Sequence, residues 1–72
     1  MQGNFDSAEE VFKVAYELAK NKRMKVYAKY NLGGIYLHYG RTDEAKEALE
    51  YVINNGNKLA VAGKAREMLE GM

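Results

Sequence analysis

The feature that most constrains the fold of this chain is an internal repeat, in which residues 3–17 (GNFDSAEEVFKVAYE) align with residues 40–54 (GRTDEAKEALEYVIN). This shift of 37 positions pairs identical residues along the chain: Gly3 with Gly40, Asp6 with Asp43, Ala8 with Ala45, Glu10 with Glu47, Ala28 with Ala65 and Leu32 with Leu69. A repeat of about this length is typical of stacked helical hairpins, whose neighbouring units bury a continuous core.

Apolar residues recur at helical spacing throughout the chain, which contains no proline and few β-branched residues. We therefore predict an all-α single domain over residues 1–72, with helices at about residues 6–20, 24–39, 42–54 and 58–70. Because the predicted connections span only a few residues, neighbouring helices must pair as antiparallel hairpins.

Residues at the predicted helix ends suggest how each helix begins and stops. A capping box is expected to start the first helix, from Ser7 and Glu10, and a side-chain cap the third, from Thr42 or Asp43. Asn21 is expected to end the first helix in a left-handed conformation, Gly40 to end the second in the same way, and Gly56, within NNGN, to end the third.

The composition is that of a water-soluble chain, with 47% hydrophobic and 29% charged residues and a net charge of +1. No apolar run approaches the roughly 18 residues of a membrane span, and the start MQGNFDSAEE lacks the pattern of a signal peptide. The absence of cysteine fits a reducing compartment, so we expect a cytoplasmic protein. With a single histidine and no paired carboxylates, we expect no enzyme, no cofactor and no metal site.

Residues 28–53 (AKYNLGGIYLHYGRTDEAKEALEYVI) resemble a tetratricopeptide repeat, because eight residues fall on the pattern of that family without a gap: Ala28, Leu32, Gly33, Tyr36, Gly40, Glu44, Ala45 and Leu49. The resemblance implies one complete repeat at about residues 26–57, flanked by half-repeats in a right-handed solenoid. Departures are Lys29, Val52 and the absence of a closing proline. The step of 37 exceeds the usual repeat of about 34 residues, which suggests an extended turn at NKRM, residues 21–24.

Two adjacent glycines lie within the predicted second helix, where each costs about 1 kcal/mol relative to alanine. We expect Gly33 to let the paired helix approach closely and Gly34 to lie on a face that receives a ligand. The residues expected to have structural roles are Ala28, Leu32, Gly33, Tyr36, Gly40, Ala45 and Leu49.

The second helix carries a further stripe at helical spacing: Tyr27, Tyr30, Asn31, Gly34, Leu37 and His38. In tetratricopeptide arrays the first helix of each hairpin lines a concave groove, so the resemblance places this stripe in the groove, with Lys64 and Glu67 of the fourth helix beside it. We expect it to bind an extended or helical peptide of a partner protein. The alternative is that the tyrosines only cover the packing of adjacent helices.

The expected rim of this groove is basic and indicates a partner that carries acidic residues; it comprises Lys22, Arg23, Lys25 and Lys29. Nucleic-acid binding by residues 20–29 (KNKRMKVYAK), with Tyr27 stacking on a base, is the less favoured alternative. A second alternative is a structural or self-assembling array, in which an uncovered apolar stripe on the first helix leads to a homodimer.

Overall fold

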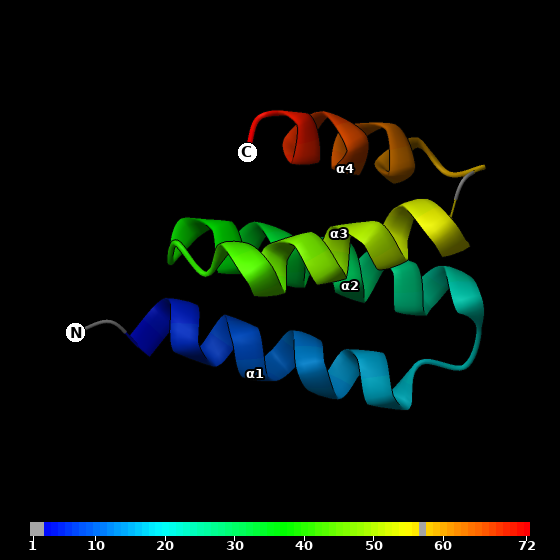
Figure 1. Ribbon diagram of the computed structural model, residues 1–72. Coiled ribbons are helices and arrows are strands. Elements are labelled where there is room, and N and C mark those ends of the chain that lie inside the picture. The colour runs from blue at the N-terminus through cyan, green and yellow to red at the C-terminus, as the bar shows by residue number, and fades with distance from the viewer. Residues whose placement is uncertain (1–2, 57) are drawn as a thin grey trace.

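The computed structural model describes residues 3–56 and 58–72, and these contain four helices: α1 (Gly3–Leu18), α2 (Lys22–His38), α3 (Thr42–Asn55) and α4 (Ala60–Glu70). The helices stack side by side, with α1 at one edge, α4 at the other and the α2–α3 hairpin between them (Figure 1). Successive helices run in opposite directions, so the predicted all-α arrangement of antiparallel hairpins is confirmed. Asn57, the last residue of the predicted NNGN stop, lies outside the described residues.

The boundary between α1 and α2 differs from the sequence prediction. α1 begins at Gly3, so Ser7 and Glu10 lie within it and the predicted capping box is wrong. Asn21 is extended, with φ −151° and ψ 168°, and its Oδ1 accepts a hydrogen bond from the Met24 N–H at 2.9 Å. Because this oxygen satisfies a first-turn N–H that has no partner inside the helix, Asn21 caps the start of α2. The expected extended turn at residues 21–24 is therefore mostly the first turn of α2.

The turn from α2 to α3 depends on Gly40, whose φ of +76° is the only positive value among the described residues. The Gly40 N–H donates to the Leu37 carbonyl at 3.0 Å, and the Arg41 N–H donates to the Tyr36 carbonyl at 2.8 Å. These two bonds are those of a Schellman motif, which needs a left-handed residue at this position. The prediction that Gly40 ends this helix in a left-handed conformation is confirmed.

The ends of α3 form in other ways than predicted. Arg41 precedes the first turn and makes no side-chain capping bond, so the prediction that Thr42 or Asp43 caps the helix is wrong. Instead, the Thr42 hydroxyl donates to the Gly40 carbonyl at 3.5 Å. Gly56 does end α3, but with φ −125°, which any residue can adopt. A Cβ on Gly56 would lie 2.7 Å from Val26 Cγ1, so space is what this position requires.

The core consists of two buried clusters that share the α2–α3 hairpin. One cluster joins it to α4 and consists of Val26, Leu49, Val52 and Ala65. The other lies toward α1, where Phe12 packs on it, and consists of Leu32, Tyr36, Ala45 and Ala48. Ala28 and Ile35 of α2 are also buried. Leu59 packs against the first cluster in an extended conformation, which delays the start of α4 to Ala60 from the predicted residue 58.

Gly33 lies where α2 packs tightly against Leu49 of α3. A Cβ at this position would lie 2.7 Å from Leu49 Cδ2 and 2.9 Å from Leu49 Cγ, and Leu49 is fully buried. Any larger residue at this point would force the two helices apart or displace Leu49. The contacts between the two helices that glycine allows thus offset its lower helix propensity.

The outer side of α1 stays apolar and exposed. Val11, Val14 and Leu18 keep 60%, 42% and 71% of their surface accessible, and no other helix of the described chain covers them. The exposed residues of α4 are mostly small or charged: Ala60, Gly63, Lys64, Arg66, Glu67 and Glu70. The two edges of the stack therefore differ in character.

Candidate functional site

One side of α2 remains open in the described structure. Tyr27, Asn31, Gly34 and His38 recur at four, three and four residues, so they share one side of the helix, here called the groove face. Asn31 and His38 are exposed, and a Cβ built on Gly34 would meet no atom within 4 Å. The groove face is therefore uncovered at its centre, in contrast to the neighbouring Gly33.

Two polar side chains of the groove face, Asn31 and His38, make contacts within α2 and with the residue that follows it. The Asn31 Nδ2 donates to the Tyr27 carbonyl one turn earlier, at 2.9 Å. That amide retains a second N–H and a carbonyl oxygen, the pair that a peptide backbone matches. The His38 ring lies edge-on to the Tyr39 ring at 5.8 Å.

Tyr30 and Leu37 belong to the same predicted stripe but lie further round α2, toward the core. Tyr30 packs against the cluster that joins α4, and Leu37 contacts both clusters. Both side chains are half-buried, an arrangement that favours the alternative of core cover for these two residues. Lys64 and Glu67 are exposed on α4, which contacts α2.

An apolar pocket that sequence reasoning missed adjoins the groove face between α1 and α2. This shallow pocket of about 270 Å³ is lined by Phe12, Ala15, Met24, Tyr27, Ala28 and Asn31. Met24 remains 50% exposed there although it is large and apolar. The available signal was the spacing of Met24, Tyr27, Ala28 and Asn31, which lie within one 120° sector of α2.

The basic residues of α2 do not all lie beside the groove face. The Arg23 guanidinium is 5.8 Å from the Tyr27 ring centre, on the predicted side. The Lys25 and Lys29 ammonium groups instead lie over the Tyr16 ring of α1, at 5.5 and 4.6 Å.

Lys22 joins Lys25 in lining a separate pocket that reaches Tyr51 of α3. The predicted basic rim is therefore wrong for Lys22, Lys25 and Lys29. These lysines lie roughly opposite Tyr27, because each residue turns an α-helix by about 100°.

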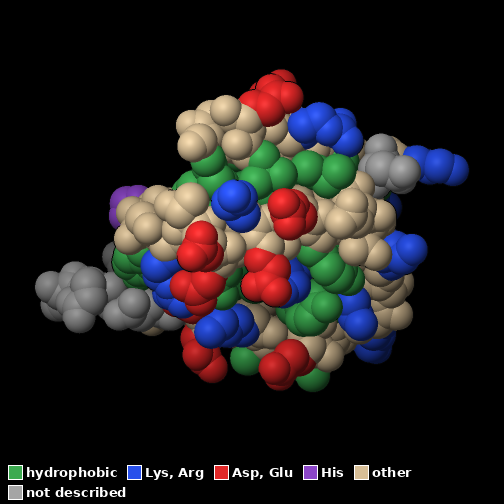
Figure 2. Space-filling model, viewed as in Figure 1, with side chains coloured by type: hydrophobic (Ala, Val, Ile, Leu, Met, Phe, Trp, Pro, Cys, Tyr) green, Lys and Arg blue, Asp and Glu red, His purple; other side chains and the backbone are tan. Residues whose placement is uncertain are grey.

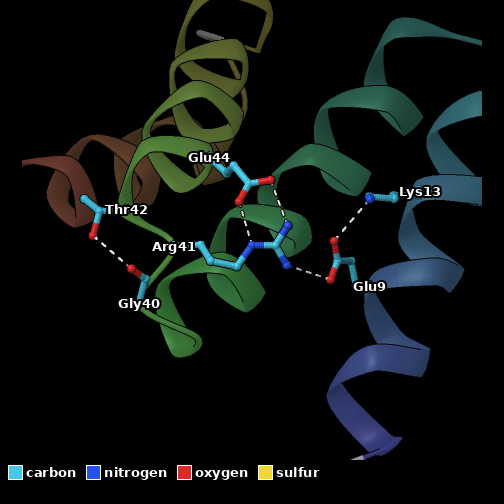
Figure 3. A network of polar contacts seen from close by, with 6 residues as sticks. All are labelled: Glu9, Lys13, Gly40, Arg41, Thr42 and Glu44. Carbon is cyan, nitrogen blue, oxygen red and sulfur yellow. Dashed lines mark hydrogen bonds and ion pairs between the residues drawn. The ribbon is translucent and has the colours of Figure 1, made fainter.

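A polar network links α1 to the turn between α2 and α3 (Figure 3). The Arg41 Nε and Nη2 donate to both carboxylate oxygens of Glu44, at 2.6 and 2.7 Å, and its Nη1 donates to Glu9 of α1 at 3.0 Å. Lys13 pairs with the other Glu9 oxygen at 3.1 Å. The guanidinium also lies 4.6 Å from the Tyr36 ring centre. Arg41 thus holds α1 against the hairpin.

These contacts shift the acidity of the groups in the network. Burial opposes ionisation of Glu9, but hydrogen bonds from Arg41 and Lys13 outweigh it, so the pKa of the Glu9 carboxyl lies below its usual value. Hydrogen bonds from Arg41 likewise lower the pKa of Glu44. Burial raises the pKa of the Tyr36 hydroxyl beside them. Because these charged groups pair with one another within the protein, we assign the network a structural role in holding α1 against the hairpin.

Within residues 3–56 and 58–72, no three His, Cys, Asp or Glu side chains come together as a possible metal site. None of the helices in this part of the chain has both the length and the apolar character needed to cross a bilayer.

Comparison with known families matched residues 1–69 to the model described as tetratricopeptide repeat. Comparison with curated proteins and with solved structures gave no match. The family match covers α1, α2, α3 and all of α4 except its last residue.

Proposed function

Because this chain belongs to the tetratricopeptide repeat family, whose repeats are in general non-enzymatic modules for protein–protein interaction, we propose that its groove face binds a segment of a partner protein. The observation that carries this proposal is the open space over Gly34, where a Cβ would meet nothing within 4 Å. An internal glycine that packing does not require costs helix stability, so its use by a ligand accounts for its presence.

The surroundings of Gly34 favour an extended or helical peptide with one apolar anchor. The absent side chain lets a ligand backbone lie close to α2, and Asn31 offers hydrogen bonds to a peptide unit. The apolar pocket between Met24 and Phe12 has room for one large side chain. Tyr27 borders both features and supplies aromatic surface with a polar tip.

The charges beside the groove face favour only a modest acidic preference in the partner. Arg23 and Lys64 contribute positive charge, and Glu67 on α4 offsets one of them. We therefore propose that the apolar anchor of the peptide provides most of the affinity. One carboxylate of the peptide near Arg23 would fix the direction in which the peptide lies.

The test is to select peptides from a displayed random library and to map their binding by two-dimensional NMR. We expect the largest shifts at Tyr27, Asn31, Gly34 and His38. Gly34→Leu should abolish binding while the protein stays folded, because the added side chain enters open space. Glu50→Leu, which adds the same exposed side chain on α3, should leave binding unchanged. Selected peptides that shift only other surfaces, or that bind Gly34→Leu normally, would refute the proposal.

Self-association is a second candidate function, favoured by the exposed apolar side of α1. Ser7, Val11, Val14 and Leu18 repeat at four, three and four residues, the spacing of a two-helix seam. Glu10 and Glu17 flank only one edge of this seam. Two copies of α1 running in parallel about a two-fold axis would place these carboxylates opposite Ala8 and Ala15, without repulsion.

Sedimentation equilibrium at several protein concentrations tests this second candidate. We expect a monomer–dimer equilibrium that Val14→Glu shifts to the monomer, because the seam would then bury a charge. A control change, Glu50→Lys on the outer side of α3, should leave the equilibrium unchanged. A strict monomer at millimolar concentration would rule out the dimer and leave the groove-face proposal untouched.

A further inference from the structure

A second charged surface lies where α1 ends and α2 begins, on the side of α2 away from the groove face. Its four lysines, here called the lysine cluster, are Lys20, Lys22, Lys25 and Lys29. All of them except Lys29 line a shallow pocket of about 260 Å³, together with Ala19, Asn21 and Tyr51. Lys and Arg side chains gather on this side of the molecule, at the right of Figure 2, where the α1–α2 turn lies in Figure 1.

Two tyrosines hold part of the lysine cluster in place. The Tyr16 and Tyr51 rings meet edge to face, with centroids 5.7 Å apart, and so join α1 to α3. The Lys29 Nζ lies 4.6 Å from the Tyr16 ring centre and 5.7 Å from that of Tyr51, and the Lys25 Nζ lies 5.5 Å from Tyr16. Cation–π attraction to these rings fixes two of the positive charges before a ligand arrives, which lowers the entropy cost of binding.

The charges of the lysine cluster are not neutralised within the described protein. In residues 3–56 and 58–72 the ion pairs involve Glu9, Lys13, Arg41 and Glu44, and none of the four clustered lysines takes part. In the part of the chain that the structure describes, Lys13 and Arg41 are thus paired with carboxylates, whereas the four lysines of the cluster are not. Four like charges in one region raise the local positive potential and favour an incoming anion.

We propose that the lysine cluster binds a compact, multiply charged oxyanion group on a segment of a partner protein, at a surface separate from the groove face. Lysine ammonium groups act as point charges with rotatable donors, which suits a phosphoryl group or closely spaced carboxylates. A phosphorylated side chain carries about −1.5 to −2 charges on three oxygens, so it can meet several ammonium groups at once.

The same surface does not suit a nucleic acid. The ring faces that could stack on bases are engaged, because Tyr16 and Tyr51 contact each other and lie beneath Lys25 and Lys29. Glu47 lies exposed one turn before Tyr51 on the same side of α3. A long polyanion that continued past the pocket along α3 would therefore meet a carboxylate, whereas a short anionic segment would not.

The experiment compares three short synthetic peptides of otherwise identical sequence, which carry two adjacent phosphoserines, two glutamates or two serines. Binding to the full chain is followed by two-dimensional NMR. We expect the charged peptides to shift Lys20, Lys22, Lys25 and Tyr51 and to bind more weakly as salt rises, and the serine peptide not to bind. If the phosphoserine peptide binds much more tightly than the glutamate peptide, the natural ligand is a phosphorylated segment. If the two peptides bind with similar affinity, the natural ligand is an acidic segment.

Matched variants distinguish binding at the lysine cluster from a general attraction of the peptide to positive charge on the protein. Lys20→Gln with Lys22→Gln removes two charges without disturbing either ring contact and should weaken binding about tenfold, which corresponds to about 1.4 kcal/mol. Lys46→Gln with Arg66→Gln removes two exposed charges elsewhere and should change affinity less than about twofold. Gly34→Leu should leave this binding intact.

Four results would overturn the proposal, and the last of them concerns Gly34→Leu. The first is the absence of any shift with both charged peptides, and the second is an equal loss of affinity in the two pairs of charge-removing variants. The third is tighter binding of a single-stranded oligonucleotide of matched charge, which would assign the surface to nucleic acid. If Gly34→Leu abolished binding, the anion would occupy the groove face, and the lysine cluster would not be its site.

Discussion

Gly33 and Gly34 are adjacent glycines in α2, one packed against α3 and the other open. Alanine substitutions at the two positions therefore separate the effect of packing on stability from the effect of helix propensity. Alanine at Gly34 enters open space, so it should gain the helix propensity that glycine lacks, about 1 kcal/mol. Alanine at Gly33 gains the same propensity but places its Cβ 2.7 Å from Leu49 Cδ2 and 2.9 Å from Leu49 Cγ. Because Leu49 is fully buried in the core, we add an overpacking cost of about 1–3 kcal/mol for its displacement.

The two alanine variants should therefore differ in the free energy of unfolding by that overpacking alone. For a domain of this size, 1 kcal/mol corresponds to about 4–8 °C in Tm, so Gly34→Ala should melt above the parent and well above Gly33→Ala. Urea denaturation followed by far-ultraviolet circular dichroism gives the free energies, and thermal melting gives Tm.

A third and a fourth variant identify the cause. Leu49→Ala makes room beside Gly33, so Gly33→Ala should cost less in that background than in the parent chain. If Gly33→Ala were as stable as Gly34→Ala in the parent, α2 and α3 would not be in close contact at this point, and the explanation offered for the glycine would be wrong.

Three further predictions concern the turns and the polar network. Gly40→Ala should lower the free energy of unfolding by about 1–2 kcal/mol, because φ is +76° there; an unchanged urea midpoint would refute the left-handed turn. Gly56→Ala should cost about 1–3 kcal/mol through its contact with Val26 Cγ1 at 2.7 Å, and Val26→Ala should reduce that cost in a double-mutant cycle. Because the pKa of Glu9 is lowered, its ion pair adds stability that is present above the unfolded pKa and lost as pH falls through the folded pKa. Urea melts from about pH 6 to about pH 3 should therefore show a shallower acid decline in Arg41→Gln than in the parent, and identical slopes would contradict it.

The turn at Gly40, which requires a positive φ, could be predicted from the residues next to it in the sequence. Gly40 follows a helical stretch and precedes an acidic first turn, and its left-handed conformation needs no distant contact. The internal repeat indicated hairpins, because identical residues recur at equivalent positions. Gly33 was placed at a close approach because it falls on a glycine of the tetratricopeptide pattern.

The features that sequence reasoning missed depend on distant neighbours. Gly56 was expected to act through its backbone, but the space that it leaves is filled by Val26, thirty positions earlier. Asn21 could end one helix or begin the next, and only the bond to Met24 distinguishes the two. Lys25 and Lys29 are an exception, because the turn of about 100° per residue already places them roughly opposite Tyr27 on α2.

Each helix of the stack is held chiefly by its neighbours, and this determines how the protein responds to mechanical load. α1 packs on α2 and α4 packs mainly on α3, so neither outer helix supports the other. Tension applied between the start of α1 and the end of α4 would peel the outer helices away one at a time and leave the α2–α3 hairpin until last. The Arg41 ion pair with Glu9 adds to the apolar packing that holds α1 in place, so the module would yield under force in steps.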